Sequence, residues 1–478
     1  MVTNEKKILE DLQQIVGREH VVIDEEGLQK YGSDQSFVKP LNPLYAVRPR
    51  SQAEICKIIL MANQKGIPVI PYSSGTNLQG AHIPTREAIT LDLSRMNKIH
   101  LIDPISRNVI LEPGVTFSHL QDEVRKQGLR VLTPLGVPST GSVIGTYLEF
   151  TPLFSWPKYG AWETLTMEMV LPNGEVMGTG QMAIKDTPYP YTWTTPYAVV
   201  NRMCLGAQGT LGVVTKAALT IKTLYETAEV FFVGFDDLTT MAEAVRKFLR
   251  IEATEEVFVA NAHYLALFLA KKWPVEFNQL KEKSAPWTLV MVVRGESEEV
   301  ELKALDLEDV ASSLQLELET ELPGMTDAGE RILNEISYPR GYLNQNRYKG
   351  AWNPIFSYTV MRNLPPFQNL ISAIADKHNY PSGDIGFLML PLNHGATFYF
   401  EPSFYRDPLD KEDSRRVEEL FLKVSRELIH QGAFFDRPYP LWAKEVYTRA
   451  SFYHRKIREI KKVVDPNNIM NPGKLALE

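Results

Sequence analysis

The sequence predicts an α+β protein with two domains, and three observations lead to this expectation. The chain has 478 residues, enough for roughly three domain-sized units. Over the first 225 residues, short apolar strands alternate with amphipathic helices. Beyond that point the predicted elements become longer, although no flexible linker or internal repeat marks the change. We therefore place the first domain at residues 1–225.

The first domain contains one helix with clear start and stop signals. Ser51 and Glu54 fit a capping box in which Glu54 reaches back to Ser51. Apolar residues then recur at helical spacing from Ile55 to Ala62, and Gly66 is a suitable C-terminal stop. Strands are expected at 67–70, 88–92, 109–112, 166–170 and 212–222.

The second half predicts longer strands and helices. Ser297 is a reasonable N-cap for one of these helices, and the stretch 327–366 has little regular pattern. Strands are expected at 231–235, 257–260, 287–293, 386–390 and 396–401, and helices at 239–249, 297–314 and 411–431.

Composition excludes several classes of function. Hydrophobic residues make up 44 % and charged residues 23 % of the chain, which is typical of a globular protein, and the net charge of −7 argues against a nucleic-acid or anionic-membrane binder. Cys56 and Cys204 are too few for a cysteine-rich zinc site, an iron–sulfur cluster or a CxxC pair. No apolar run reaches the roughly 18 residues of a membrane span, and no signal core follows Met1. We expect a cytoplasmic protein that uses an organic cofactor for any redox chemistry.

Three loops of small residues are the strongest functional signal. They cover 71–77, 138–145 and 206–215, and such loops let backbone N–H groups converge on a phosphate. Neither a dinucleotide fingerprint nor a Walker loop is present. Each loop alone is most simply a surface turn, but three of them suit a long phosphate-bearing cofactor. The candidate cofactor-binding residues are Pro71, Ser73, Ser74, Gly75, Thr76, Asn77, Pro138, Ser139, Thr140, Ser142, Val143, Gly145, Gly209, Gly212, Val213 and Val214.

These loops belong to a wider pattern that resembles the vanillyl-alcohol oxidase and p-cresol methylhydroxylase superfamily, to which glycolate oxidase and D-lactate dehydrogenase flavoproteins are related. The matching segments are 46–49, 75–77, 91–99, 112–116, 138–145, 158–160, 170–176, 209–215 and 464–474. The resemblance implies FAD, a two-part flavin domain of the p-cresol methylhydroxylase type, and an antiparallel-sheet cap domain. It places the cap at 226–430, returns the segment 431–478 to the flavin domain, and adds Asn471 to the cofactor-binding residues.

The flavin loop departs from the family pattern in two ways. Ser73 and Ser74 replace glycines, so the backbone approaches the cofactor less closely. Asn77 and Leu78 stand where some relatives have the histidine that links FAD covalently. His82 lies a few residues further on, and two interpretations remain open: it faces the flavin, or it is an ordinary, partly exposed histidine. Some relatives link FAD through a histidine or tyrosine of the cap, and His394, Tyr348 and Tyr358 lie in the cap of this chain.

The second half carries the substrate chemistry. The histidine-rich metal segment of the hydroxy-acid branch is absent, so we expect no bound metal. The layout after the helix at 411–431 is similar to that of the vanillyl-alcohol and p-cresol branch, with Arg437 at the family's arginine but Asp436 in place of its tyrosine. The candidate catalytic residues are Arg437, His394 and Arg340. Glu401 is a further candidate base, although an outward-pointing charge on an alternating strand is ordinary.

Together these features predict an FAD-dependent oxidase or dehydrogenase. It would move a hydride from an activated C–H of a small alcohol or para-substituted phenolic (benzylic) substrate to flavin N5. A 2-hydroxy-acid dehydrogenase of the D-lactate or glycolate type is the alternative, and a non-catalytic or electron-relay subunit of a larger complex is another. We expect an electron-acceptor protein as a further partner and a homo-oligomeric state.

Overall fold

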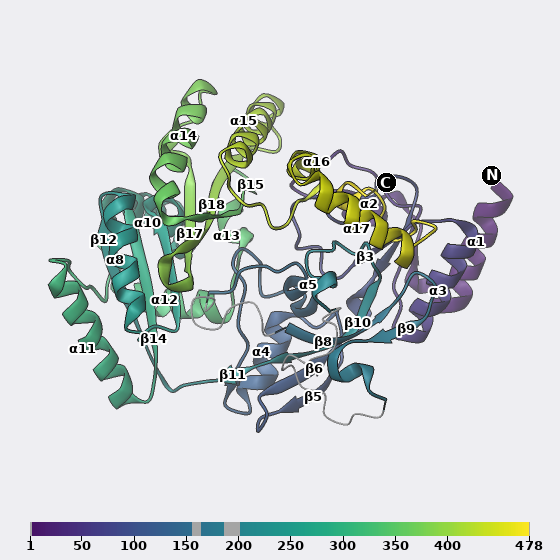
Figure 1. The fold of residues 1–478 in the computed structure, drawn as a ribbon, viewed down its shortest axis with the longest axis horizontal. Coiled ribbons are helices and arrows are strands. Elements are labelled where there is room, and N and C mark those ends of the chain that lie inside the picture. The colour runs from purple at the N-terminus through teal and green to yellow at the C-terminus, as the bar shows by residue number, and fades with distance from the viewer. Residues whose placement is uncertain (1, 155–163, 186–200, 478) are drawn as a thin grey trace.

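The computed structural model describes residues 2–154, 164–185 and 201–477, and it divides into two halves that lie side by side (Figure 1). The matched segment 158–160 lies outside the described residues. The first half holds a four-stranded sheet of order β1-β2-β4-β3 and a five-stranded sheet of order β5-β6-β10-β8-β9. These strands are β1 Val21–Val22, β2 Tyr45–Val47, β3 Val69–Tyr72, β4 Ile89–Asp92, β5 Ile99–Asp103, β6 Asn108–Leu111, β8 Thr164–Val170, β9 Val176–Gly178 and β10 Val213–Thr220.

Most predicted elements of the first half form within one or two residues of their expected positions. The strand expected at 212–222 divides into β10 and β11 Lys222–Thr223, because β11 leaves the large sheet and pairs with β7 Leu129–Arg130. The helices are α1 Val2–Val16, α2 Glu25–Gly32, α3 Gln52–Lys65, α4 Phe117–Arg125, α5 Val143–Leu148 and α7 Asn201–Cys204.

Helix α3 begins and ends at the predicted residues. The Ser51 hydroxyl accepts the Glu54 N–H, and Gly66 ends the helix with φ +67°, a conformation that favours glycine. The reciprocal half of the capping box is wrong, since the Glu54 carboxylate accepts from the backbone of Arg50 at 2.8 Å. The buried face of α3 packs into the core between the two sheets of this half.

The second half is a seven-stranded antiparallel sheet of order β12-β14-β13-β17-β18-β15, with β16 also paired to β18. The expectation of an antiparallel cap sheet is confirmed. Its strands are β12 Thr227–Phe235, β13 Glu256–Asn261, β14 Trp287–Gly295, β15 Ala351–Pro354, β16 Ser357–Val360, β17 Gly386–Leu392 and β18 Thr397–Arg406. Its helices are α8 Leu238–Arg250, α9 Ala262–Leu269, α10 Val275–Lys283, α11 Ser297–Ser313, α12 Ala328–Ser337, α13 Tyr342–Asn346, α14 Leu364–Lys377 and α15 Lys411–His430.

Two predictions for the second half are wrong. Helix α11 has Glu296 at its N-cap position, and Ser297 is already helical. The stretch expected to be irregular contains α12, α13, β15 and β16. These elements are short and carry many polar residues, so their periodicity is weak in the sequence.

Strand β18 is buried along both faces except at its two ends. It pairs with β17 on one side and with β15 and β16 on the other, at the side of the cap that meets the first half. Glu401 on this strand is therefore buried, and its interpretation as an outward-pointing surface charge is wrong.

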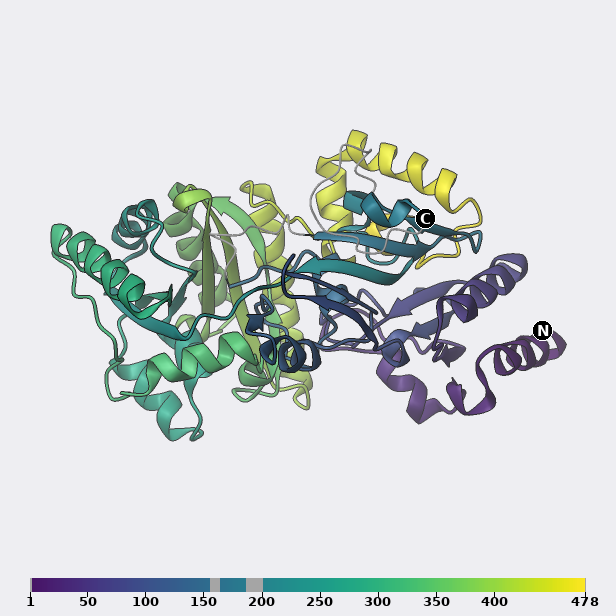
Figure 2. The ribbon, with the colours of Figure 1, turned by 90° about the horizontal axis from the view of Figure 1, so that it is seen from below.

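The C-terminal helices α16 Pro440–Arg449 and α17 Ser451–Val464 lie along the first half of the chain, as both views show (Figure 2). Met470 forms a parallel bridge with Val69, and the Asn471 N–H donates to the Val69 carbonyl at 3.0 Å. Within the described ranges, none of the helices combines the length and the apolar character that crossing a bilayer requires.

A buried ion cluster joins the two halves. Arg130 on β7 donates to Glu255 at 2.7 Å and to Glu256 at 2.6 Å, and Glu256 also accepts from Arg294 on β14 at 2.9 Å. All four side chains are less than a tenth exposed. The cluster fixes β7 of the first half against β13 and β14 of the cap.

Candidate functional site

A cavity of about 220 Å³ lies between the two halves, where the small-residue loops meet. Its walls come from all three loops, from the end of α5, from the cap strands β15 and β18, and from the C-terminal segment. The predicted residues that line it are Pro71, Ser73, Ser74, Gly75, Thr76, Asn77, Gly145, Gly209, Gly212, Val214, Asn471 and Arg437.

The first two loops are in direct contact. The Ser74 hydroxyl accepts the Ser142 N–H at 2.9 Å, and Ser142 in turn caps α5 by accepting the Gly145 N–H at 2.9 Å. A Cβ on Gly145 would lie 2.7 Å from the Ser73 hydroxyl. The two loops therefore approach so closely that Gly145 leaves no room for a side chain.

The third loop and the C-terminal segment close the opposite wall. Gly209 has φ +71°, and a Cβ there would meet the Pro71 ring at 3.0 Å. The Asn471 amide donates to the Gln208 carbonyl at 2.6 Å and to the Ala81 carbonyl at 3.1 Å. Stretches that are far apart in the sequence thus surround one groove.

Other predicted cofactor residues support the loops without lining the cavity. Pro138 accepts the Gly141 N–H in a tight turn, and the Ser139 N–H donates to Pro339 of the cap. Thr140 is exposed. The remaining three, Ser142, Val143 and Val213, are buried in the packing beneath the loops.

Two predicted catalytic residues lie elsewhere. His394 is exposed in the turn η6 Asn393–Gly395, which packs on α8, and it does not line the cavity. Arg340 donates to Glu335 at 2.5 Å, and its side chain is more than a third exposed. The structure therefore does not bring these two residues together with Arg437. His394 lies in the turn between β17 and β18, and the ion pair with Glu335 holds Arg340 away from the cavity.

Arg437 is buried at the cap side of the cavity. Its Nε lies 3.4 Å from the Asp436 carboxylate, and its guanidinium lies 4.1 Å from the centre of the Phe356 ring. Burial alone would lower its pKa, but Asp436 and nearby tyrosines raise the pKa of Arg437 above its usual value. The guanidinium is thus a fixed positive charge.

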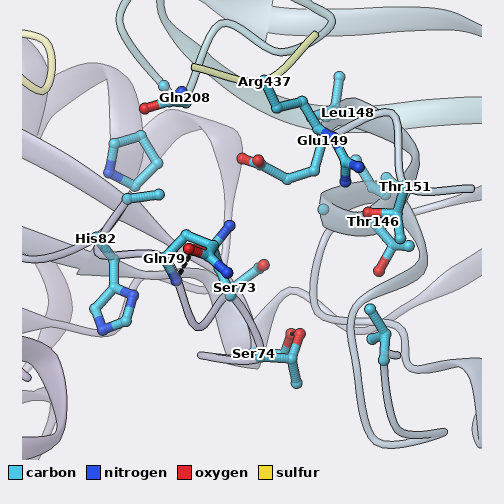
Figure 3. Close-up of a pocket in the computed structure, with 18 of the residues that line it drawn as sticks. Ser73, Ser74, Gln79, His82, Thr146, Leu148, Glu149, Thr151, Gln208 and Arg437 are labelled. Atoms are coloured by element: carbon cyan, nitrogen blue, oxygen red, sulfur yellow. Dashed lines mark hydrogen bonds between the residues drawn. The ribbon is translucent and has the colours of Figure 1, made fainter. Parts of the chain in front are cut away.

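Glu149 lies beside Arg437, and both face the loop that carries Ser73 and Gln79 (Figure 3). The Tyr439 hydroxyl donates to the Glu149 carboxylate and accepts from the Asn77 amide at 2.9 Å. Burial raises the pKa of Glu149, while the Tyr439 hydrogen bond and Arg437 oppose that shift. This chain of hydrogen bonds ties the first loop to the end of α5 and to the C-terminal segment.

Glu401 reaches the same cavity from β18. Its carboxylate accepts a hydrogen bond from Tyr399, which also lines the cavity. Burial raises the pKa of Glu401 from 4.5 to about 7, although Tyr399 and Arg437 act in the opposite direction. Glu401 is therefore suited to exchange a proton near neutral pH.

His82 lines the cavity and packs edge-on against Tyr72, with ring centres 5.3 Å apart. Burial lowers the pKa of His82, although Asp34 acts in the opposite direction. Tyr348 packs on His263 inside the cap, and Tyr358 is half-buried near Asp436. Neither tyrosine lines the cavity.

Sequence reasoning missed several lining residues, among them Glu149, Tyr439 and Phe356. Glu149 carried a usable signal, because it follows Gly145 by one helical turn and so lies on the same side of α5. Phe356 comes from the chain just after β15, in the stretch without a regular pattern. Among the described residues, no group of three His, Cys, Asp or Glu side chains is arranged to hold a metal ion.

Family models match both halves of the chain. A model described as an FAD binding domain matches residues 43–180, and one described as the C-terminal domain of FAD linked oxidases matches 224–433 and 454–475. The chain belongs to the FAD-linked oxidases. It is a member of the p-cresol methylhydroxylase and vanillyl-alcohol oxidase superfamily, its cofactor is FAD, and it is an FAD-dependent oxidoreductase.

Individual relatives fall into two chemical groups. The chain is 24 % identical to glycolate oxidase subunit GlcD of Bacillus subtilis, over 98 % of this chain and 97 % of that protein. It is 24 % identical to a mitochondrial D-lactate dehydrogenase (cytochrome) of Arabidopsis thaliana, over 99 % of this chain and 80 % of that protein. The crystal structure of p-cresol methylhydroxylase with substrate bound superposes with a TM-score of 0.84 at 18 % identity, over 99 % of this chain and 97 % of that one. The last likeness confirms the predicted fold.

The glycines on the cavity wall stand where neighbouring residues leave no room for a side chain, so a larger residue there would push the FAD loops apart. We expect Gly145→Val to weaken FAD binding about 10- to 100-fold, since added methyl groups meet Ser73 and Ser142 and cost about 1–3 kcal/mol. The measurement is a titration of apoprotein with FAD followed by flavin fluorescence. Gly383→Val is the matched control, because nothing lies within 4 Å of a Cβ at Gly383. Equal affinities of the two variants would contradict the assignment of this wall to FAD.

Proposed function

We propose that this enzyme oxidises a small para-substituted phenol at its benzylic carbon. When bound, FAD supplies the redox chemistry by accepting a hydride equivalent at N5. The observation that carries the proposal is the balance of charge around Arg437. The aromatic walls and the position of Glu401 support it.

The charge balance favours a neutral substrate. Among the described residues that line the cavity, Arg437 is the only arginine or lysine, whereas Glu149 and Glu401 are carboxylic acids. Arg437 also has Asp436 as a partner at 3.4 Å. A carboxylate substrate would add negative charge to a buried site whose single cation is already paired, which is costly in a low-dielectric environment. A neutral phenol enters without that cost.

The walls at this end of the cavity are largely aromatic. Trp352, Phe356 and Tyr399 line it, and the Phe356 ring also packs under the Arg437 guanidinium. Flat aromatic surfaces suit a planar ring, with which they pack in offset or edge-on geometry. A C2 or C3 hydroxy acid has no surface of comparable size to bury here.

The side chains have separate roles in the proposed reaction. Glu401 accepts the phenolic proton, and the hydride then leaves the benzylic carbon, so the substrate loses one proton and one hydride and is oxidised by two electrons. Arg437 stabilises negative charge that develops on the phenolic oxygen. The hydrogen bonds of Glu149, Tyr439 and Asn77 hold the first loop in register with this end of the cavity.

A 2-hydroxy-acid substrate is the second candidate. Two relatives matched over nearly the whole chain carry the names glycolate oxidase and D-lactate dehydrogenase, which favours this chemistry. In that case Arg437 would hold the carboxylate and Glu401 would take the hydroxyl proton.

Anaerobic mixing with a substrate panel tests the proposal. We expect p-cresol and vanillyl alcohol to reduce the bound FAD and so bleach the yellow holoenzyme. D-lactate and glycolate should leave the FAD oxidised. Bleaching by the hydroxy acids alone would overturn the proposal and favour the second candidate.

Glu401→Gln provides an independent test of the base. We expect the rate of FAD reduction to fall about 100-fold or more. The wild-type rate should rise with pH through about 7, where Glu401 ionises, and the variant should lack this limb. Since the folded pKa of Glu401 is raised above 4.5, ionisation costs stability as the pH rises from about 4.5 to 7, and the variant should lose that dependence. If the rate of FAD reduction by Glu401→Gln depended on pH as the wild-type rate does, Glu401 would be excluded as the base.

A further inference from the structure

Helix α17 presents an exposed apolar face that no described element covers. Phe452, Tyr453, Ile460 and Val463 are 66 %, 61 %, 37 % and 83 % exposed. With 3.6 residues per turn, these four side chains fall within an arc of about 100° on one side of the helix. Such a cluster on one face is typical of an interaction surface, whereas isolated exposed apolar residues are ordinary. We call these four residues and the cations beside them the α17 surface.

The α17 surface is basic, although the whole chain carries a net charge of −7. The guanidinium of Arg455 lies 5.0 Å from the centre of the Phe452 ring, and the Lys456 ammonium lies 5.9 Å from it. Arg458 and Lys462 are also exposed, and Glu459 is the one acidic residue of the helix. The charge is therefore complementary to an acidic partner.

The opposite side of the same helix reaches the FAD cavity. Lys461 is buried and donates to the Thr210 carbonyl at 2.6 Å and to the Met470 carbonyl at 2.9 Å. Thr210 lies between Gly209 and Leu211, which both line the cavity. The α17 surface is thus separated from the cofactor loop by about one helix diameter, roughly 10 Å.

We propose that the α17 surface docks an acidic redox protein that takes electrons from the reduced enzyme. The inference rests on the oxidoreductase activity, since each substrate oxidation leaves two electrons that must go to an acceptor. Two molecules of a one-electron carrier would be reduced per substrate oxidised, and two protons would pass to water. Apolar contacts would hold the partner, and the surrounding cations would speed its encounter.

The test uses holoenzyme reduced with dithionite, so its outcome does not depend on the phenolic substrate. The probes are the soluble domain of cytochrome b5, an acidic haem protein, and cytochrome c, a basic one. The variant is Arg455→Glu/Lys456→Glu, and the matched control is Arg415→Glu/Arg426→Glu on the exposed side of α15, which changes the net charge equally. A third variant, Ile460→Ser/Val463→Ser, removes apolar surface and leaves the charge unchanged.

We expect cytochrome b5 to be reduced about 10-fold or more slowly by the α17 charge variant than by wild type, with a weaker dependence on salt. The apolar variant should also reduce cytochrome b5 more slowly, while the α15 control should match wild type. A small neutral quinone should reoxidise all the variants at the wild-type rate. Equal loss in both charge variants, or faster reduction of cytochrome c than of cytochrome b5 by wild type, would overturn the proposal. Two further results would also overturn the proposal. One is a wild-type dimer that the α17 variants abolish, because the surface would then bind a second copy of the chain. The other is binding of wild type to anionic vesicles that the α17 variants abolish, because the surface would then bind a membrane.

Discussion

Arg437→Gln is expected to slow the reduction of bound FAD by a phenolic substrate about 100- to 1000-fold, the effect of removing one preorganised charge partner from a developing oxyanion. The guanidinium is the single arginine or lysine on the described cavity wall, so no neighbouring cation replaces it. Substrate binding should weaken less than the rate, because the negative charge on the phenolic oxygen is largest in the transition state. Rapid mixing under anaerobic conditions measures the rate and the affinity separately.

Two controls separate this effect from a loss of structure. The FAD content and thermal midpoint of Arg437→Gln show whether the site still folds, and Arg362→Gln removes an exposed arginine of the same domain that lies outside the cavity. A reduction rate within a few-fold of wild type would remove Arg437 from the mechanism.

Arg130→Met is expected to destabilise the protein by about 3–5 kcal/mol, because it removes a buried cation that pairs with two buried carboxylates. Arg130 bonds Glu255 and Glu256 at 2.7 and 2.6 Å, and all three side chains are at most 5 % exposed. Glu256 keeps its ion pair with Arg294, whereas Glu255 loses its ion pair with Arg130. Urea denaturation followed by tryptophan fluorescence measures the loss.

The same experiment has two internal comparisons. Adding Glu255→Gln to Arg130→Met should recover part of the stability, since it removes a buried carboxylate that has lost its ion pair with Arg130. Lys423→Met breaks an exposed pair with Glu427 on α15 and should cost less than about 1 kcal/mol. A similarly small loss for Arg130→Met would show that the buried cluster does not hold the two halves together.

The sequence predicted those parts of the molecule whose local signals agree with their packing. Helix α3 was found because its cap, its apolar spacing and Gly66 all indicate the same bounds. The cofactor loops are detectable because small residues recur in three separate segments of the first domain. Their convergence required the topology, in which Met470 pairs with Val69 and Asn471 bonds Gln208.

The substrate end of the site was predicted less well, for physical reasons. Alternation on β18 suggested that one face is exposed, whereas packing buries both and gives Glu401 its raised pKa. His394 lies only seven residues from Glu401, but it is in an exposed turn at the end of the strand. Distance along the chain therefore did not indicate which of the two reaches the cavity.

In the proposed reaction, Arg437 and Glu401 recognise a phenolic hydroxyl at one end of the FAD cavity. A direct measurement compares 4-hydroxybenzyl alcohol with its O-methyl ether as reductants of the holoenzyme under anaerobic conditions. We predict that the phenol reduces FAD at least about 1000-fold faster, since a site built to bond a hydroxyl discriminates strongly against an analogue that lacks its proton. Equal rates for the phenol and the ether would contradict the claim.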